Sequence, residues 1–407
     1  MRTSSHWFAR GLLFLFCGGL LIAWKTANAK PDGASNWSFS DHDRFIQVTD
    51  GPLKDRITQS NSVTSSDATI FFPLISNNIQ AQKGIWISEQ ELAKLPASGP
   101  AWERLKEAAD ENPGNPDLSD REENINIIIL AKALVYARTG VEKYRDEVAK
   151  AIEYITFTNT EENGNILPLG RNLAAYVISA DLIGLPAYDP GLDRDFRAKL
   201  RELLSKKIQG WGSAFKSLQE TQEKRPNNWG THAGAARAAV AVYLGDAAEL
   251  ERTAEVFRGY LGDRSAYDDF DFGDDLSWQC NPLKPVGVNP SECAKEGHQI
   301  GGVLPEEMRR GGSFQWPPLE TGYPWEGLQG ALVQAEILHR AGYPAWEWQD
   351  QALLRAVQFL NGIGWEAEGD DEWQIWLVNR AYGTSFPTAF PAQPGKNMGW
   401  TDWTHAP

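Results

Sequence analysis

The chain has 407 residues and a formal net charge of −15 at pH 7, and 42% of its residues are hydrophobic. Nucleic acids and anionic membranes repel such an acidic protein, so neither is an expected partner. The length is sufficient for one large domain or two ordinary ones with well-developed cores.

The N-terminal residues 1–29 are typical of a secretory signal peptide. Arg2 and Arg10 supply positive charge, residues 11–24 are apolar, and Ala27-Asn28-Ala29 offers a cleavage site of small residues. The apolar run is shorter than the roughly 20 residues of a spanning helix, although an uncleaved anchor is the alternative. Cleavage after Ala29 would change the charge from −15 to −18 by removing three cationic residues. We therefore expect a periplasmic or secreted protein without stable membrane insertion.

Residues 30–66 are polar and are expected to form an N-terminal arm, whereas residues 67–407 are expected to form a single helical domain. Apolar residues recur with helical spacing through most of this domain. Ser88 and Glu91 form a capping box for the first helix, and Gly140 ends another. The predicted helices are 89–95, 125–137, 142–155, 173–183, 193–208, 228–244, 247–261, 327–340 and 348–360.

Short turns connect several of these helices, as at Gly245-Asp246, so consecutive helices should be antiparallel neighbours. The predicted fold is all-α, an incomplete (α/α) toroid of antiparallel helical hairpins. Two regions lack the helical pattern, residues 267–323 and the tail 364–407. Both are expected to be long loops over the cleft, where binding groups are often placed.

Two cysteines remain after cleavage, Cys280 and Cys293. In an oxidising compartment they can form a disulfide that closes a short proline-containing loop. Two reduced thiols are the alternative. A metal site is less consistent with the sequence, because no paired CxxC or HxxH spacing accompanies them.

Asn228 and His232 stand four residues apart at the start of an alanine-rich helix, so both side chains share one helix face. The amide can bind a carboxylate, and the imidazole can move a proton. Together they are suited to removing a proton next to a carboxylate, as sugar-acid chemistry requires. A helical histidine is, however, more often a core residue.

A second candidate cluster follows. Arg309 and Arg310 precede a glycine pair, and Tyr323 comes before the next predicted helix. Arginine is suited to bidentate capture of a carboxylate. At helical spacing, one of the two arginines could instead pair locally with Glu306 or Glu307.

The order of these motifs resembles the alginate-lyase superfamily of polysaccharide lyases, in its helical-toroid glucuronan and alginate lyase branch. The resemblance rests on Asn-Asn with a nearby His, then Leu-Pro-x-Glu-x-x-Arg at 304–310, then Tyr323. Segments 84–88, 170–176 and 379–384 are also similar, and the likeness spans about residues 85–403. Two features depart from well-known alginate lyases. Three residues separate Asn228 from His232, and the stretch between Arg310 and Tyr323 is longer.

The resemblance implies β-elimination from a uronic-acid polymer. Asn228 and one of Arg309 and Arg310 would bind the uronate carboxylate and disperse the charge that develops as the C5 proton leaves. Tyr323 and His232 would share the roles of base and acid. In mannuronate and glucuronate the C5 proton and O4 lie on one side, so Tyr323 alone can serve both. In guluronate they lie on opposite sides, which would require His232 as the base.

The displacement of His232 from its usual place favours Tyr323 in both roles, and hence mannuronate-rich alginate or glucuronan. Further substrate contacts are expected from similar segments and from tryptophans, whose rings stack on sugar faces, although ordinary packing explains many of them. The candidate substrate-binding residues are Arg171, Asn172, Tyr176, Trp229, Trp316 and Trp325.

No metal or cofactor is expected. The acidic run 268–275 could hold Ca²⁺ but lacks the spacing of an EF-hand loop. Two other functions remain open. A glycoside hydrolase on a helical toroid needs two opposed carboxylates, for which Glu320, Glu326 and Asp181 are candidates. A non-catalytic polysaccharide-binding or export protein would need neither His232 nor Tyr323.

Overall fold

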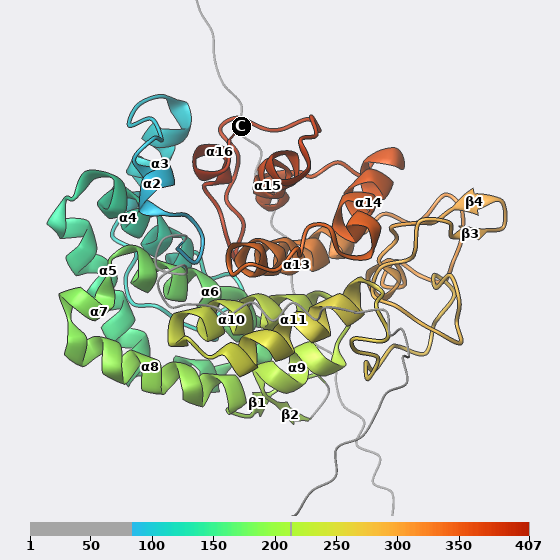
Figure 1. The fold of residues 1–407 in the computed structure, drawn as a ribbon, viewed down its shortest axis with the longest axis horizontal. Coiled ribbons are helices and arrows are strands. Elements are labelled where there is room, and N and C mark those ends of the chain that lie inside the picture. Colours follow the sequence, from blue (N-terminus) through green and yellow to red (C-terminus); the bar gives the residue numbers. More distant parts are fainter. Residues whose placement is uncertain (1–83, 212–213, 407) are drawn as a thin grey trace, which may run out of the picture. The chain divides into compact units, whose positions relative to one another are not determined.

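The computed structural model describes residues 84–211 and 214–406, which all belong to one compact unit. The expected signal peptide (1–29) and polar arm (30–66) lie outside the described residues. The described part is mostly helical, which confirms the all-α prediction (Figure 1). Within these ranges no helix combines the length and the apolar character needed to cross a bilayer.

The helices are α2 (Glu89–Leu92), α3 (Pro100–Asp110), α4 (Ile125–Thr139), α5 (Glu142–Phe157), α6 (Ile166–Leu182), α7 (Leu185–Tyr188), α8 (Pro190–Ser205), α9 (Leu218–Lys224), α10 (Asn228–Leu244), α11 (Ala247–Leu261), α12 (Pro305–Met308), α13 (Tyr323–Arg340), α14 (Trp348–Gly362), α15 (Trp373–Tyr382) and α16 (Thr401–Thr404). Short 3₁₀ helices are η1 (Thr160–Asn163) and η2 (Gly369–Asp371). Two antiparallel hairpins pair β1 (Ile208–Gln209) with β2 (Phe215–Lys216), and β3 (Ala294–Lys295) with β4 (His298–Gln299).

Four helices form a continuous inner row, in which α4 packs on α6, α6 on α10 and α10 on α13 (Figure 1). Most side chains of α10 are buried, as expected for a helix that is apolar all round and has neighbours on several sides. A second row packs against the first, through contacts of α5 with α4, of α9 and α11 with α10, and of α14 with α13. Helices α5, α8 and α11 are amphipathic and keep one face towards solvent.

Helix ends follow the local signals in the sequence. Ser88 and Glu91 form the expected capping box of α2. Gly140 ends α4 in the left-handed region at φ 71°, which a residue without Cβ adopts at little cost. Predicted helices 228–244 and 247–261 match α10 and α11 to the residue.

Other predictions need correction. The helix predicted at 173–183 begins at Ile166, because the side chain of Asn165 caps it. The helix predicted at 193–208 is α8, which Asp189 caps and which ends at Ser205. Helices α3 and α9 were not predicted, and α15 lies in the tail that was expected to be irregular.

The long segment between α11 and α13 is largely irregular, as predicted, and contains the β3–β4 hairpin and α12. Cys280 and Cys293 form a disulfide within it, which confirms the predicted pairing. Helix α12 belongs to this segment and lies beside the start of α10, because Glu307 of α12 accepts the backbone N–H of Asn228. Within the segment, Gly273 N donates to Glu306 Oε1 at 2.9 Å.

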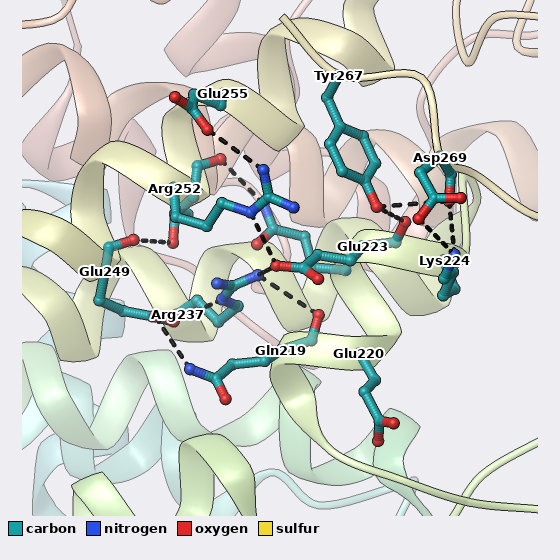
Figure 2. Close-up of polar contacts among 12 residues, drawn as sticks. Gln219, Glu220, Glu223, Lys224, Arg237, Glu249, Arg252, Glu255, Tyr267 and Asp269 are labelled. Carbon is teal, nitrogen blue, oxygen red and sulfur yellow. Dashed lines mark hydrogen bonds and ion pairs between the residues drawn. The ribbon is translucent and has the colours of Figure 1, made fainter. Parts of the chain in front are cut away.

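A fully paired group of charged residues joins α9, α10 and α11, and we call it the Arg237 network (Figure 2). The Arg237 side chain is only 1% exposed, and its Nε donates to Glu249 Oε1 at 2.7 Å. Its Nη1 lies 3.5 Å from Glu223 Oε1, which also accepts from Arg252 Nε at 3.1 Å. Gln219 Nε2 completes the network by donating to Glu249 Oε2 at 3.0 Å. These contacts fix α10 to the outer row.

Candidate functional site

The first turn of α10 carries Asn228, which is 2% exposed and follows the capping residue Asn227. Its side-chain Nδ2 donates to Glu326 Oε2 at 2.9 Å, and its backbone N–H donates to Glu307 Oε1. Asn228 therefore joins α10 to the first turn of α13 and to α12.

Arg171 of α6 approaches the same carboxylate. Its Nη2 lies 3.8 Å from Glu326 Oε2, and its side chain is 5% exposed. Its Nη1 donates to the backbone oxygen of Arg121 at 3.3 Å, whereas its buried Nε has no partner among the described residues. We refer to Asn228, Arg171, Glu307 and Glu326 as the Asn228 cluster. An amide and a guanidinium thus converge on one carboxylate from different helices.

His232 lies one turn further along α10 and is fully buried. Two glycines allow neighbouring helices to approach it closely. A Cβ on Gly330 of α13 would lie 2.4 Å from His232 N, and one on Gly170 of α6 would lie 3.0 Å from Ala233 N. Neither ring nitrogen of His232 has a hydrogen-bond partner in the described ranges. Burial, assisted by the charge of Arg171, lowers the pKa of His232, so its imidazole is neutral.

The two candidate arginines have different environments. Arg309 Nη2 donates to Glu306 Oε2 at 2.8 Å, so the local pairing foreseen for one arginine applies to Arg309. Arg310 is exposed, and its guanidinium carbon lies 4.0 Å from the ring centroid of Tyr323. Tyr323 is the first residue of α13 rather than part of the preceding loop, and it is partly exposed. The structure therefore brings Arg310 and Tyr323 together.

Glu307 was considered in the sequence analysis only as a local partner for an arginine. Its side chain is fully buried, and its Oε2 has no partner in the described part of the chain. Burial raises the pKa of Glu307 to about 8, against the opposing effects of the Asn228 N–H and of Arg310. The Leu-Pro-x-Glu-x-x-Arg pattern contained this residue, but its spacing alone does not reveal that the glutamate turns inwards to α10.

Three candidate substrate-binding residues have packing roles in this structure. Asn172 is fully buried, and its Nδ2 donates to the backbone oxygen of Asp120 at 3.0 Å. Tyr176 is also fully buried, and its hydroxyl donates to Glu123 Oε1 at 2.5 Å. Trp325 is 4% exposed and donates from Nε1 to the backbone oxygen of Trp365 at 3.2 Å. These hydrogen bonds engage the three side chains within the fold, and their contact with a substrate stays a prediction.

Two candidate aromatic residues remain accessible. Trp229 is partly exposed and packs edge-on against Trp211, with ring centroids 6.3 Å apart. Trp316 is 38% exposed and stacks on His298, with centroids 4.3 Å apart and an interplanar angle of 12°. Only these two of the predicted tryptophans offer a ring to solvent.

The carboxylates considered for a hydrolase are not gathered as an opposed pair. Asp181 accepts from Ile85 N at 3.0 Å near the end of α6, roughly 15 Å along that helix from Arg171. A cavity of about 570 Å³ opens there, so it is separate from the Asn228 cluster. Glu320 is exposed, and only Glu326 joins the cluster. Among the described residues no group of three or more His, Cys, Asp or Glu is placed to hold a metal ion.

Comparison with known protein families gives a match. A family model described as alginate lyase covers residues 82–267. This range contains Arg171, Asn228 and His232, and it ends before Arg310 and Tyr323. No curated protein matches the chain.

Proposed function

Residues 82–267 place this chain in the alginate lyase family of polysaccharide lyases, and from this premise we propose that it cleaves mannuronate-rich alginate or glucuronan by β-elimination. The observation that carries the proposal is the convergence of Asn228 and Arg171 on the carboxylate of Glu326. The same two groups can hold the carboxylate of a uronate. The Glu326 side chain is 36% exposed, so it can give way to the substrate.

Carboxylate binding makes the C5 proton removable. This proton is only weakly acidic, because negative charge accumulates on the carboxylate as it leaves. An amide donor and a guanidinium aimed at that carboxylate stabilise the charge where it develops. Asn228 supplies the amide, and Arg171 supplies a guanidinium from α6. Arg310 lies over the Tyr323 ring and is proposed to add a second guanidinium, because it makes no hydrogen bond or ion pair with the described residues, whereas Arg309 is engaged by Glu306.

Tyr323 is the proposed proton-transfer residue. It is partly exposed at the start of α13, and the guanidinium of Arg310 lies over its ring. A deprotonated Tyr323 takes the C5 proton and then delivers a proton to the departing O4 from the same side. The C4–O4 bond breaks, and the electron pair from C5 forms the C4–C5 double bond.

His232 is proposed to act from within the core. Its neutral, buried imidazole lies one turn behind Asn228, and Arg171 is near enough to affect its titration. It orients the carboxylate-binding groups rather than removing the proton itself. Because guluronate requires a base on the face opposite Tyr323, the buried position of His232 supports the same-side substrates.

The test is to incubate the protein with polymannuronate, polyguluronate, glucuronan and a neutral polysaccharide at matched concentrations. A lyase produces ultraviolet absorbance from the C4–C5 double bond conjugated to the carboxylate. A hydrolase releases reducing ends without that absorbance, and a binding protein does neither. We expect absorbance with polymannuronate or glucuronan. A clear preference for polyguluronate would make His232 the base and overturn the proposed role of Tyr323.

The toroidal arrangement of the helices and the cellular location of the protein are part of the same proposal. The inner and outer rows of helices support an incomplete (α/α) toroid, which an experimental structure with a bound oligosaccharide would test. The signal-like N-terminus supports export to the periplasm or medium. N-terminal sequencing of the secreted protein should begin at Lys30, and retention of the full chain inside the cell would contradict export.

A further inference from the structure

Glu307 is a buried carboxyl at the meeting point of three helices. It projects from α12 and accepts the backbone N–H of Asn228, the first residue of α10. The first N–H groups of an α-helix have no partner within the helix, and Asn228 carries one of these groups in α10. Glu307 supplies one of these missing partners from a segment 79 residues away in the sequence.

The third helix makes room for this carboxyl. A Cβ on Gly327 of α13 would lie 3.0 Å from Glu307 Oε1 and 3.1 Å from its Cγ. Any side chain at Gly327 would therefore push the carboxyl away from Asn228. Gly327 also follows Glu326 directly, and Glu326 accepts the Asn228 amide. Glu307 thus binds the backbone that presents Asn228 and lies close to the first turn of α13, which carries Tyr323 and Glu326.

We propose that Glu307 is a positioning residue of this site, which holds the first turns of α10 and α13 in register so that Asn228 and Tyr323 act on one sugar. This inference rests on the proposed lyase function. Glu307 itself does not touch the substrate, because its side chain is fully buried. Arg310, three residues further along the chain, is attached to the same short helix and is positioned with it.

The charge state of Glu307 matters for an anionic substrate. The charged groups that act on its carboxyl are Arg310 and Glu306 from its own segment and Glu326 from α13. Tyr260 from α11 also interacts with it, and the N–H of Asn228 from α10 donates to it. Its pKa is raised to about 8, so the neutral form predominates below that pH. Above it, a second negative charge appears beside Glu326 and behind the carboxylate-binding amide. Like charges repel, so uronate binding weakens as Glu307 ionises.

The experiment compares Glu307→Gln and Glu307→Ala with the wild type, using polymannuronate and glucuronan from pH 6 to pH 10. Glutamine keeps an oxygen that can accept the Asn228 N–H, and it cannot ionise. We expect Glu307→Gln to retain kcat within a few-fold. Its KM should stay flat as pH rises, whereas the wild-type KM should increase above about pH 8. Glu307→Ala should lose about 10²-fold in kcat, the effect of a displacement of about 1 Å at a reacting centre.

Gly327→Ala is the second variant, because it keeps the carboxyl but displaces it. We expect a several-fold fall in kcat per folded molecule, and the melting temperature measures the stability lost through the displaced carboxyl. Asp181→Asn is the matched control. Asp181 is another carboxyl that accepts one backbone N–H from a distant segment, and burial also raises its pKa. Its loss should lower stability without changing kcat or the pH dependence of KM.

The outcomes separate this inference from the proposed function. If the wild type gives no conjugated product from any uronate polymer, the lyase function fails. If the wild type is active, the inference is overturned when Glu307→Ala folds with wild-type kcat, or when Gly327→Ala leaves kcat unchanged. An identical rise of KM with pH in Glu307→Gln and the wild type would overturn the role of its charge. If Glu307→Ala does not fold, Gly327→Ala and Glu307→Gln decide the question.

Discussion

The two polar clusters on α10 differ in how completely their atoms are paired. In the Arg237 network, charged groups from three helices satisfy one another (Figure 2). Roughly 14 Å away along the helix, the Asn228 cluster contains buried polar atoms without partners in the described part of the chain. These atoms belong to Arg171 and Glu307, and both ring nitrogens of the adjacent His232 share this property.

Buried polar groups are normally paired, because an unpaired one costs free energy. We therefore expect the two clusters on α10 to have different roles. The Arg237 network stabilises the packing of α9, α10 and α11. The Asn228 cluster retains hydrogen-bonding capacity that a ligand or a reaction can use. Mutations at the two clusters should accordingly separate stability from activity.

The largest effect is expected at the reactive end. Tyr323→Phe should lower the elimination rate by roughly 10²–10⁴-fold, because it removes a proton-transfer group. The Arg310 contact with the ring remains, so folding and polymer binding should be nearly unchanged. Initial rates of conjugated product and a titration with polymer measure the two properties. A variant that eliminates at the wild-type rate would remove Tyr323 from the mechanism.

The Arg237 network should show the opposite behaviour. Arg237→Ala leaves Glu249 without its buried partner and should lower the free energy of unfolding by about 3–5 kcal/mol. Activity per folded molecule should be unchanged. Arg252→Ala is the control from the same network. The Arg252 side chain is 41% exposed, so its removal should cost less than about 1 kcal/mol.

Denaturant titrations followed by activity assays below the transition would check this pair. The distinction between the clusters breaks down if Arg237→Ala stays as stable as the wild type but loses its catalytic rate.

An intermediate effect should separate the two neighbouring arginines. Arg310→Ala should lower kcat/KM by about 10–100-fold, as expected for losing a charged hydrogen bond to substrate. Arg309→Ala should mainly lower the melting temperature, because it leaves the buried Glu306 without its ion pair. Steady-state kinetics on both variants measure the difference, and equal kinetic losses would contradict the assignment to Arg310.

A separate effect concerns the pH dependence of stability. The pKa of Glu307 rises from 4.5 to about 8 on folding, so the folded state binds its proton more tightly than the unfolded state. Its contribution to stability is therefore fully present below about pH 4.5 and is lost as pH rises towards about 8. Glu307→Gln should gain stability relative to the wild type across that window. Urea titrations at several pH values test this, and a constant difference would contradict the buried, protonated state.

Periodicity and caps predicted most of the helices, because these signals are local. Helix α10 matches its predicted bounds since an asparagine cap precedes it and Gly245 ends it. Helix α15 was missed because glycine-rich and proline-rich stretches surround its ten residues. The start of α6 was misplaced because Pro168 and Gly170 weaken the helical pattern, although proline is tolerated in a first turn.

The candidate site was only partly predictable. Motif order identified Asn228, Tyr323 and the pair Arg309 and Arg310, without a choice between the two arginines; the structure now describes their contacts. Spacing cannot show which side chains turn inwards, so it did not reveal that Tyr176 is fully buried. The importance of Glu307 depends on a contact across 79 residues of sequence, which no local pattern encodes.

The close approach of α13 to α10 at Gly330 limits how far these two helices can move apart. No side chain separates α13 from the backbone of α10 at this position. The two helices can therefore be expected to move as one body, and they carry Asn228 and Tyr323 together. Adjustment to polymers of different bulk then falls on the loop between α12 and α13. Efforts to alter substrate range should vary that loop and leave the glycine contact intact.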